Sequence, residues 1–128
     1  MKRREILKLA AGLSFLPWRR VAGAVNRGKV LYFTRSAAGE HAVVKRRGAE
    51  PSVSEKSMIE MGRLRGFDVE RTNDGRVFEG DLSGFDAIAF YPSGDLTRPA
   101  PDGSPPMSAA GKQRLLEAIA TRLNAKSP

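Results

Sequence analysis

Apolar residues form three short runs along the chain, and each run has the length and composition of a β-strand. Residues 29–34 (KVLYFT) are strand formers without polar alternation, which is typical of a strand buried on both faces. Residues 67–71 (FDVER) alternate between apolar and polar, so they predict a second, more exposed strand. Residues 86–91 (DAIAFY) predict a third buried strand.

Two further segments have helical spacing. Ser52 and Glu55 match a capping box, in which Ser52 caps the helix and Glu55 reaches back to it, and Gly66 is a natural C-terminal stop. The predicted apolar face of this helix consists of Met58, Ile59, Met61 and Leu64. Ser108 is expected to cap a last helix. The apolar stripe of that helix consists of Leu115, Leu116, Ile119 and Leu123.

The connecting segments are rich in turn residues. Residues 35–51 have no clear period and contain two glycines and a proline, which indicates a loop. Asp74-Gly75 is a turn signal, and it is followed by a short irregular or single-turn segment. That segment is expected to pack through Val77, Phe78, Leu82 and Phe85. Residues 92–106 contain five prolines and predict a long loop.

The order strand, helix, strand, strand, helix predicts an α/β fold with a parallel sheet and right-handed crossovers. We expect a flavodoxin-like, three-layer arrangement with strand order 2-1-3. In such sheets, ligands bind beyond the carboxyl ends of the strands, where the strand order reverses. This rule places the loop after Thr34 beside the loop after Tyr91, with Ser36 next to Ser93 and Gly94.

The N-terminal segment, residues 1–24, does not fit this pattern. It begins KRREILK, which resembles a twin-arginine export signal, and an apolar stretch follows from Leu9 to Leu16. That stretch is too short to span a bilayer, which needs about 20 residues. The small residues Ala22-Gly23-Ala24 suit a cleavage site. We therefore expect export to the periplasm, with membrane contact through the signal only. The alternative is an amphipathic basic helix that stays attached to residues 25–128, the expected domain.

Most of the net positive charge of the chain lies in this N-terminal segment. The net charge is +8, but six of the 22 basic residues and one of the 14 acidic residues lie in the first 24 positions, which leaves +3 on the rest. Both signs are interspersed there, and no groove-reading motif accompanies them, so the composition argues against nucleic-acid binding. The basic run Lys45-Arg46-Arg47 is interpreted as a solvated loop.

Absent residue types exclude several kinds of chemistry. The sequence contains no cysteine, which excludes disulfides, thiolate metal sites and a cysteine nucleophile. The single histidine and scattered acids lack metal-ligand spacing. Residues 34–39 resemble a flavin phosphate loop only faintly, because a long loop rather than a helix follows them. No cofactor is expected.

Several motifs in order carry a resemblance to a known family. They are the Thr-Arg-Ser start of residues 34–36, the Glu40-His41 pair, DGRVF at 74–78, FYPSGDL at 90–96 and PPMSA at 105–109. With the strand before them, they resemble the ThuA-like family, named for trehalose utilisation, over about residues 29–120. The resemblance implies a fold similar to class I glutamine amidotransferases and a carbohydrate-related role. The amidotransferase reaction itself is excluded, because it needs a cysteine nucleophile.

The sequence departs from that family in two places. Ala38-Gly39 stands before Glu40, where the family usually has glycine and then an aromatic residue, so the backbone path of the loop is expected to differ. The family also continues with a glycine-rich strand after the last helix, and residues 121–128 do not resemble it. We therefore expect a domain truncated after its third strand and helix.

Candidate site residues lie in the loops after the first and third strands. His41 and Asp95 are the acid/base candidates, and Thr34, Arg35, Ser36, Ser93 and Gly94 are the candidate ligand-binding residues. Each has a structural alternative. His41 could bond backbone as a loop histidine, Asp95 could form an Asx-turn or a helix cap, and residues 34–36 could stabilise their loop.

Two functional hypotheses remain open. The first is an exported ThuA-like domain that acts on or binds carbohydrate, and the sequence does not decide whether it is catalytic. The second is a truncated remnant or small interaction module without a complete site. In the second case, the outer edge of the third strand would be exposed and open to self-association.

Overall fold

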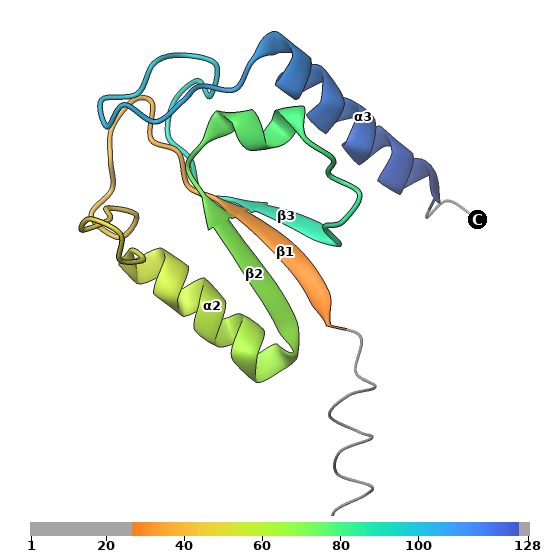
Figure 1. The fold of residues 1–128 in the computed structure, drawn as a ribbon, viewed down its shortest axis with the longest axis horizontal. Coiled ribbons are helices and arrows are strands. Elements are labelled where there is room, and N and C mark those ends of the chain that lie inside the picture. Colours follow the sequence, from red (N-terminus) through yellow and green to blue (C-terminus); the bar gives the residue numbers. More distant parts are fainter. Residues whose placement is uncertain (1–26, 126–128) are drawn as a thin grey trace, which may run out of the picture.

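The computed structural model describes residues 27–125 as a three-layer α/β fold (Figure 1). Strands β1 (Gly28–Phe33), β2 (Phe67–Thr72) and β3 (Ala87–Phe90) form one parallel sheet in the order β2-β1-β3. Helix α2 (Val53–Arg65) packs against one face of the sheet. A 3-10 helix, η1 (Gly75–Glu79), and helix α3 (Ala109–Ala125) lie on the other face. The predicted fold class and strand order are confirmed.

Strand β1 is central because its residues can be buried on both faces. Val30 pairs with Val69 of β2 and Ala87 of β3, so these three residues share the face toward α2. Leu31 and Phe33 point to the opposite face, where both are fully buried.

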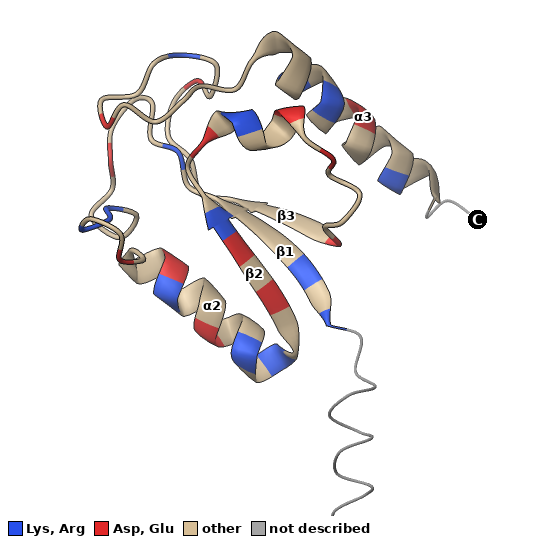
Figure 2. Cartoon of the chain, viewed as in Figure 1, with Lys and Arg blue, Asp and Glu red and all other residues tan. Residues whose placement is uncertain are grey.

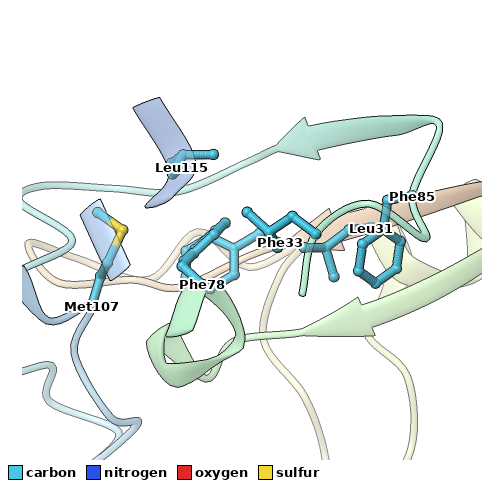
Figure 3. Close-up of a cluster of buried hydrophobic side chains, with 7 residues drawn as sticks. Leu31, Phe33, Phe78, Phe85, Met107 and Leu115 are labelled. Carbon is cyan, nitrogen blue, oxygen red and sulfur yellow. The ribbon is translucent and has the colours of Figure 1, made fainter. Parts of the chain in front are cut away.

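The main hydrophobic core lies between the sheet and the layer of η1 and α3 (Figure 3). The Phe33 ring contacts the Phe78 ring edge-on, with centroids 4.9 Å apart. Each fully buried side chain of this size stabilises the fold by about 1.5–3 kcal/mol. The cluster consists of Leu31, Phe33, Phe78, Leu82, Phe85, Met107 and Leu115. The predicted packing of the segment around η1 is therefore confirmed for Phe78, Leu82 and Phe85.

The predicted helix ends are also confirmed. Ser52 accepts a hydrogen bond from the Glu55 backbone N–H, and the Glu55 carboxylate accepts one from the Ser52 N–H at 2.8 Å. Gly66 ends α2 in the left-handed conformation, with φ of 81°. The Ser108 hydroxyl accepts from the Gly111 N–H at 3.0 Å and caps α3.

The predicted buried face of α2 is wrong for three of its four residues, and only Met58 is partly buried. Ile59, Met61 and Leu64 are 40%, 50% and 66% exposed, whereas the buried positions are Glu55 and Gly62. Gly62 determines this packing, because a Cβ at that position would lie 2.5 Å from the Phe67 carbonyl oxygen. The helix backbone therefore approaches β2 through its glycine, and the larger apolar residues remain at the surface.

The predicted burial of α3 and β3 is only partly correct. Of the expected stripe on α3, only Leu115 is buried, whereas Leu116 and Ile119 are 52% and 44% exposed. On β3, Phe90 is 40% exposed, and Tyr91, which follows the strand, is 43% exposed. The reason is that β3 is an edge strand and has a neighbour on one side only.

Candidate functional site

The loops after β1 and β3 meet at the carboxyl end of the sheet (Figure 1). Ser36 forms an isolated parallel bridge with Ser93, and the Ala37 N–H donates to the Ser93 carbonyl at 2.8 Å. This bridge continues the pairing of β1 and β3 beyond the strands. The prediction that Ser36 lies beside Ser93 is confirmed.

Ser93 and Gly94 hold the two loops together. The Ser93 hydroxyl donates to the Gly39 carbonyl and accepts from the Gly39 N–H at 3.2 Å. Gly94 has φ of 72°, and a Cβ there would lie 2.6 Å from the Ala38 Cβ. Only glycine fits such a close approach at a left-handed position. Both predicted ligand-binding residues therefore have structural contacts in this arrangement.

The two acid/base candidates, His41 and Asp95, contact different residues. The His41 ring is exposed and meets the Tyr91 ring edge-on at 6.0 Å. The Asp95 carboxylate accepts from the Thr97 N–H at 2.9 Å, which is an Asx-turn, and from the Thr97 hydroxyl at 2.7 Å. These hydrogen bonds lower the pKa of Asp95. Within residues 27–125, no hydrogen bond or ion pair joins His41 to Asp95.

The Arg35 side chain is fully buried beneath the proline-rich loop. Its guanidinium donates to the carbonyls of Leu96, Arg98 and Ser104, at 3.1, 2.5 and 3.1 Å. These hydrogen bonds are of the loop-stabilising kind. The Nε of Arg35 is buried and has no hydrogen-bond partner among the described residues.

Thr34 and Ser36 instead line a polar cavity of about 260 Å³ at the carboxyl ends of β1 and β2. Both residues are nine-tenths or more buried, at 4% and 5% exposure. Neither hydroxyl has a hydrogen-bond partner among the described residues. Neither hydroxyl oxygen is itself sealed from solvent, since the one buried side-chain nitrogen or oxygen without a partner among the described residues is Arg35 Nε. Both hydroxyls therefore face the cavity and are free to bond a ligand or water there. The other lining residues are Glu40, Val44, Arg46, Gly48, Asn73 and Asp102.

A chain of hydrogen bonds forms one wall of this cavity. Arg46 pairs with the fully buried carboxylate of Glu55, and its Nη1 donates to the Asn73 Oδ1 at 3.1 Å. The Asn73 Nδ2 donates to Asp102 at 3.3 Å. Asp102 in turn accepts from the Ser104 N–H and hydroxyl, at 2.9 and 2.6 Å. The wall therefore joins the loops after all three strands.

Both carboxylates of this network favour the ionised form. Burial raises the pKa of Glu55, but hydrogen bonds from Arg46 and the Ser52 N–H outweigh it, so the pKa is lowered. Burial also raises the pKa of Asp102, and hydrogen bonds from Ser104 and Asn73, with the charge of Arg35, reverse the shift. The wall thus holds the Arg46–Glu55 ion pair and a second carboxylate, Asp102, which hydrogen bonds keep ionised.

Sequence reasoning missed Glu40, Arg46, Asn73 and Asp102 as members of one site. Asn73 follows β2 directly, and the rule that ligands bind at the carboxyl ends of parallel strands could have indicated it. Arg46 was interpreted as part of a solvated basic run. That interpretation is wrong for Arg46, which is half-buried against Glu55, whereas Lys45 and Arg47 are exposed.

Two further kinds of feature, a metal-binding cluster and a membrane-spanning helix, are absent from the described residues. No cluster of three or more His, Cys, Asp or Glu side chains in residues 27–125 could hold a metal ion. None of the described helices is long and apolar enough to cross a membrane. The predicted export signal, residues 1–24, lies outside the described residues.

Comparison with protein-family models, with curated proteins and with solved structures finds no match. The resemblance to the ThuA-like family therefore rests on the sequence motifs alone.

Proposed function

We propose that this chain is an exported domain of the ThuA-like type that binds carbohydrate, and that the cavity lined by Thr34 and Ser36 holds the sugar. The observation that carries the proposal is the pair of hydroxyls, on the mostly buried residues Thr34 and Ser36, that face the cavity without protein partners. A hydroxyl both donates and accepts, and carboxylate and amide groups lie around it, so the cavity matches the hydrogen-bonding needs of sugar hydroxyls. Its volume of about 260 Å³ lies just below the range of drug-sized sites, so it suits a ligand no larger than a monosaccharide.

The proposal is one of binding and includes no catalytic step. Neither His41 nor Asp95 lines the cavity. The lowered pKa of Asp95 also makes that carboxylate a poor proton donor near neutral pH.

Sugar titration of the full chain tests this proposal, with isothermal calorimetry and a panel that includes D-glucose and trehalose. Thr34→Val and Ser36→Ala each remove one hydroxyl, and we expect each to weaken binding about five- to tenfold, the value of one hydrogen bond. Thr121→Val is the matched control, because Thr121 is exposed on α3. Absence of sugar binding, or equal affinities for all variants, would contradict the proposal.

The outer edge of β3 favours a second candidate, an interaction module. The other edge strand, β2, carries Asp68, Glu70 and Arg71, whereas β3 has the uncharged sequence AIAF (Figure 2). Charged residues normally protect edge strands against pairing, so β3 is the less protected edge. Beside it lies an apolar groove of about 130 Å³, which Ile88, Phe90, Leu115, Ala118, Ile119 and Arg122 line.

We propose that the partner at this edge is β3 of a second copy. In an antiparallel pair, uncharged strand meets uncharged strand, and the two Asp86 residues lie at opposite ends, so these like charges do not meet. Analytical ultracentrifugation of the full chain should show a concentration-dependent dimer. Ala87→Lys should weaken the dimer about tenfold or more, whereas Ala110→Lys, exposed on α3, should not. A monomer at high micromolar concentration would contradict this candidate.

A further inference from the structure

Asn73 is held at both ends of its side-chain amide. Arg46 donates to its Oδ1, and its Nδ2 donates to Asp102, at 3.1 and 3.3 Å. The opposite amide orientation would turn the NH₂ group toward the guanidinium and the oxygen toward the carboxylate, and both contacts would be repulsive. The network therefore fixes which end of Asn73 carries the donor.

A fixed amide offers a defined pattern to a ligand. The Asn73 Oδ1 keeps a second lone pair, and its Nδ2 keeps a second N–H. Asn73 lines the cavity together with the unpaired hydroxyls of Thr34 and Ser36. This combination of an oriented donor, an oriented acceptor and adaptable hydroxyls suits a ligand with several hydroxyl groups.

The charges around the cavity disfavour an anion. Glu40 lines it without an ion-pair partner among the described residues, and Asp102 adds a second carboxylate. Arg46 is the lining cation, and it shares the buried Glu55 carboxylate with Arg71, which does not line the cavity. A phosphate group in the cavity would therefore face two lining carboxylates, whereas the one lining guanidinium, Arg46, is already bonded to Glu55 and Asn73.

From these observations we infer that Asn73 determines the specificity of the cavity, and that the cavity selects uncharged polyhydroxylated ligands over their phosphorylated counterparts. The inference rests on the proposed function, because it names the ligand class of the same site. It adds a role for Asn73 and Glu40, neither of which was among the candidate site residues of the sequence.

Competitive affinity measurements on the full chain test the inference. Calorimetric titrations would compare D-glucose, D-glucose 6-phosphate and inorganic phosphate. We expect the wild type to bind glucose about tenfold or more tightly than glucose 6-phosphate. Asn73→Asp removes the N–H donor and sets a third carboxylate at the cavity, so it should weaken glucose binding about tenfold. Asn124→Asp, on the exposed end of α3, is the control.

Glu40→Gln provides a second variant that leaves the fold intact, because Glu40 is exposed and unpaired among the described residues. It should reduce the preference for glucose over glucose 6-phosphate severalfold, whereas Glu79→Gln, also exposed, should not change it. Equal wild-type affinities for the two sugars would overturn the inference but leave sugar binding intact, as would a preference unaffected by Glu40→Gln. Failure of the wild type to bind any sugar would overturn the proposed function itself.

Discussion

Three consecutive residues, Thr34, Arg35 and Ser36, continue the chain beyond Phe33, the last residue of β1, and contact two sides of the molecule. Alternation along an extended chain sends Thr34 and Ser36 to one side, where they line the cavity. Arg35 points to the other side and holds the proline-rich loop. The segment therefore supplies both the unpaired hydroxyls of the site and the anchor of a loop that forms its wall.

At the same scale, Gly62 is the position where α2 and β2 come closest. Gly62→Ala would place a Cβ 2.5 Å from the Phe67 carbonyl oxygen, so the helix must move away from the strand. We expect the free energy of unfolding to fall by about 1–3 kcal/mol, as for other overpacked sites. Urea unfolding measures this change. Gly84→Ala, with open space around the new methyl group, is the control, and equal stability of the two variants would contradict the account.

Glu55 links stability to pH. Its carboxylate is fully buried, and its pKa is lowered from the usual 4.5 in the folded state. The ion pairs with Arg46 and Arg71 therefore stabilise the fold fully when the pH is above the usual pKa of 4.5. This contribution is lost as the pH falls through the lowered pKa of the folded state.

Glu55→Gln keeps the shape of the side chain and removes the charge. We expect a loss of about 3 kcal/mol near neutral pH, the low end for a broken buried pair, because both arginines are partly exposed. The acid-induced loss of stability should also become shallower. Unfolding measured from pH 3 to pH 7 tests both effects. If the pH dependence of the unfolding free energy were the same in the variant, Glu55 would not be the group whose protonation destabilises the fold.

At the scale of elements, local signals predicted the strands and the helix ends, because caps and apolar runs are local. The buried face of α2 could not be predicted in this way. Apolar residues were assigned to the interior, whereas the close approach of Gly62 to β2 determines which side of the helix is buried. The wall of the cavity was missed for a related reason, since Arg46, Asn73 and Asp102 come from three separate loops.

One buried side chain, Arg35, holds the proline-rich loop, residues 92–106, through hydrogen bonds to its backbone carbonyls. Arg35→Met would leave the carbonyls of Leu96, Arg98 and Ser104 without their guanidinium donors. Hydrogen exchange in the loop should accelerate about tenfold or more, while exchange in β1 stays slow. Mass spectrometry of peptic fragments measures both. Arg63→Met, an exposed position on α2, is the control, and identical exchange in the two variants would contradict the role of Arg35.

At the scale of the whole molecule, the strand order could be predicted because parallel crossovers follow few rules. The same rules predict that Ser36 lies beside Ser93, and the bridge between the two residues confirms it. They could not place His41, since its position depends on the path of the loop over residues 35–51, which no topological rule determines. The ring of His41 lies against Tyr91, and no hydrogen bond or ion pair joins it to Asp95 within residues 27–125.

Export is a property of the whole chain and depends on its first residues. The pattern KRREILK at positions 2–8 motivates the proposal that the twin-arginine route carries the chain to the periplasm. Replacement of Arg3 and Arg4 together by lysine should abolish export, because the pattern requires the arginine pair. Fractionation of cells that express a tagged chain measures this. The same replacement at Arg19 and Arg20 is the control, and normal export of the Arg3/Arg4 variant would contradict the assignment.

Chemical-shift mapping tests the central claim most directly, because it reports both whether a sugar binds and where. The full chain, labelled with ¹⁵N, would be titrated with D-glucose and with trehalose. The account predicts saturable shifts at the cavity, in the amides of Thr34, Ser36 and Asn73, and in the side-chain amide of Asn73. Saturable shifts confined to the groove beside β3, or no shifts with either sugar, would contradict it.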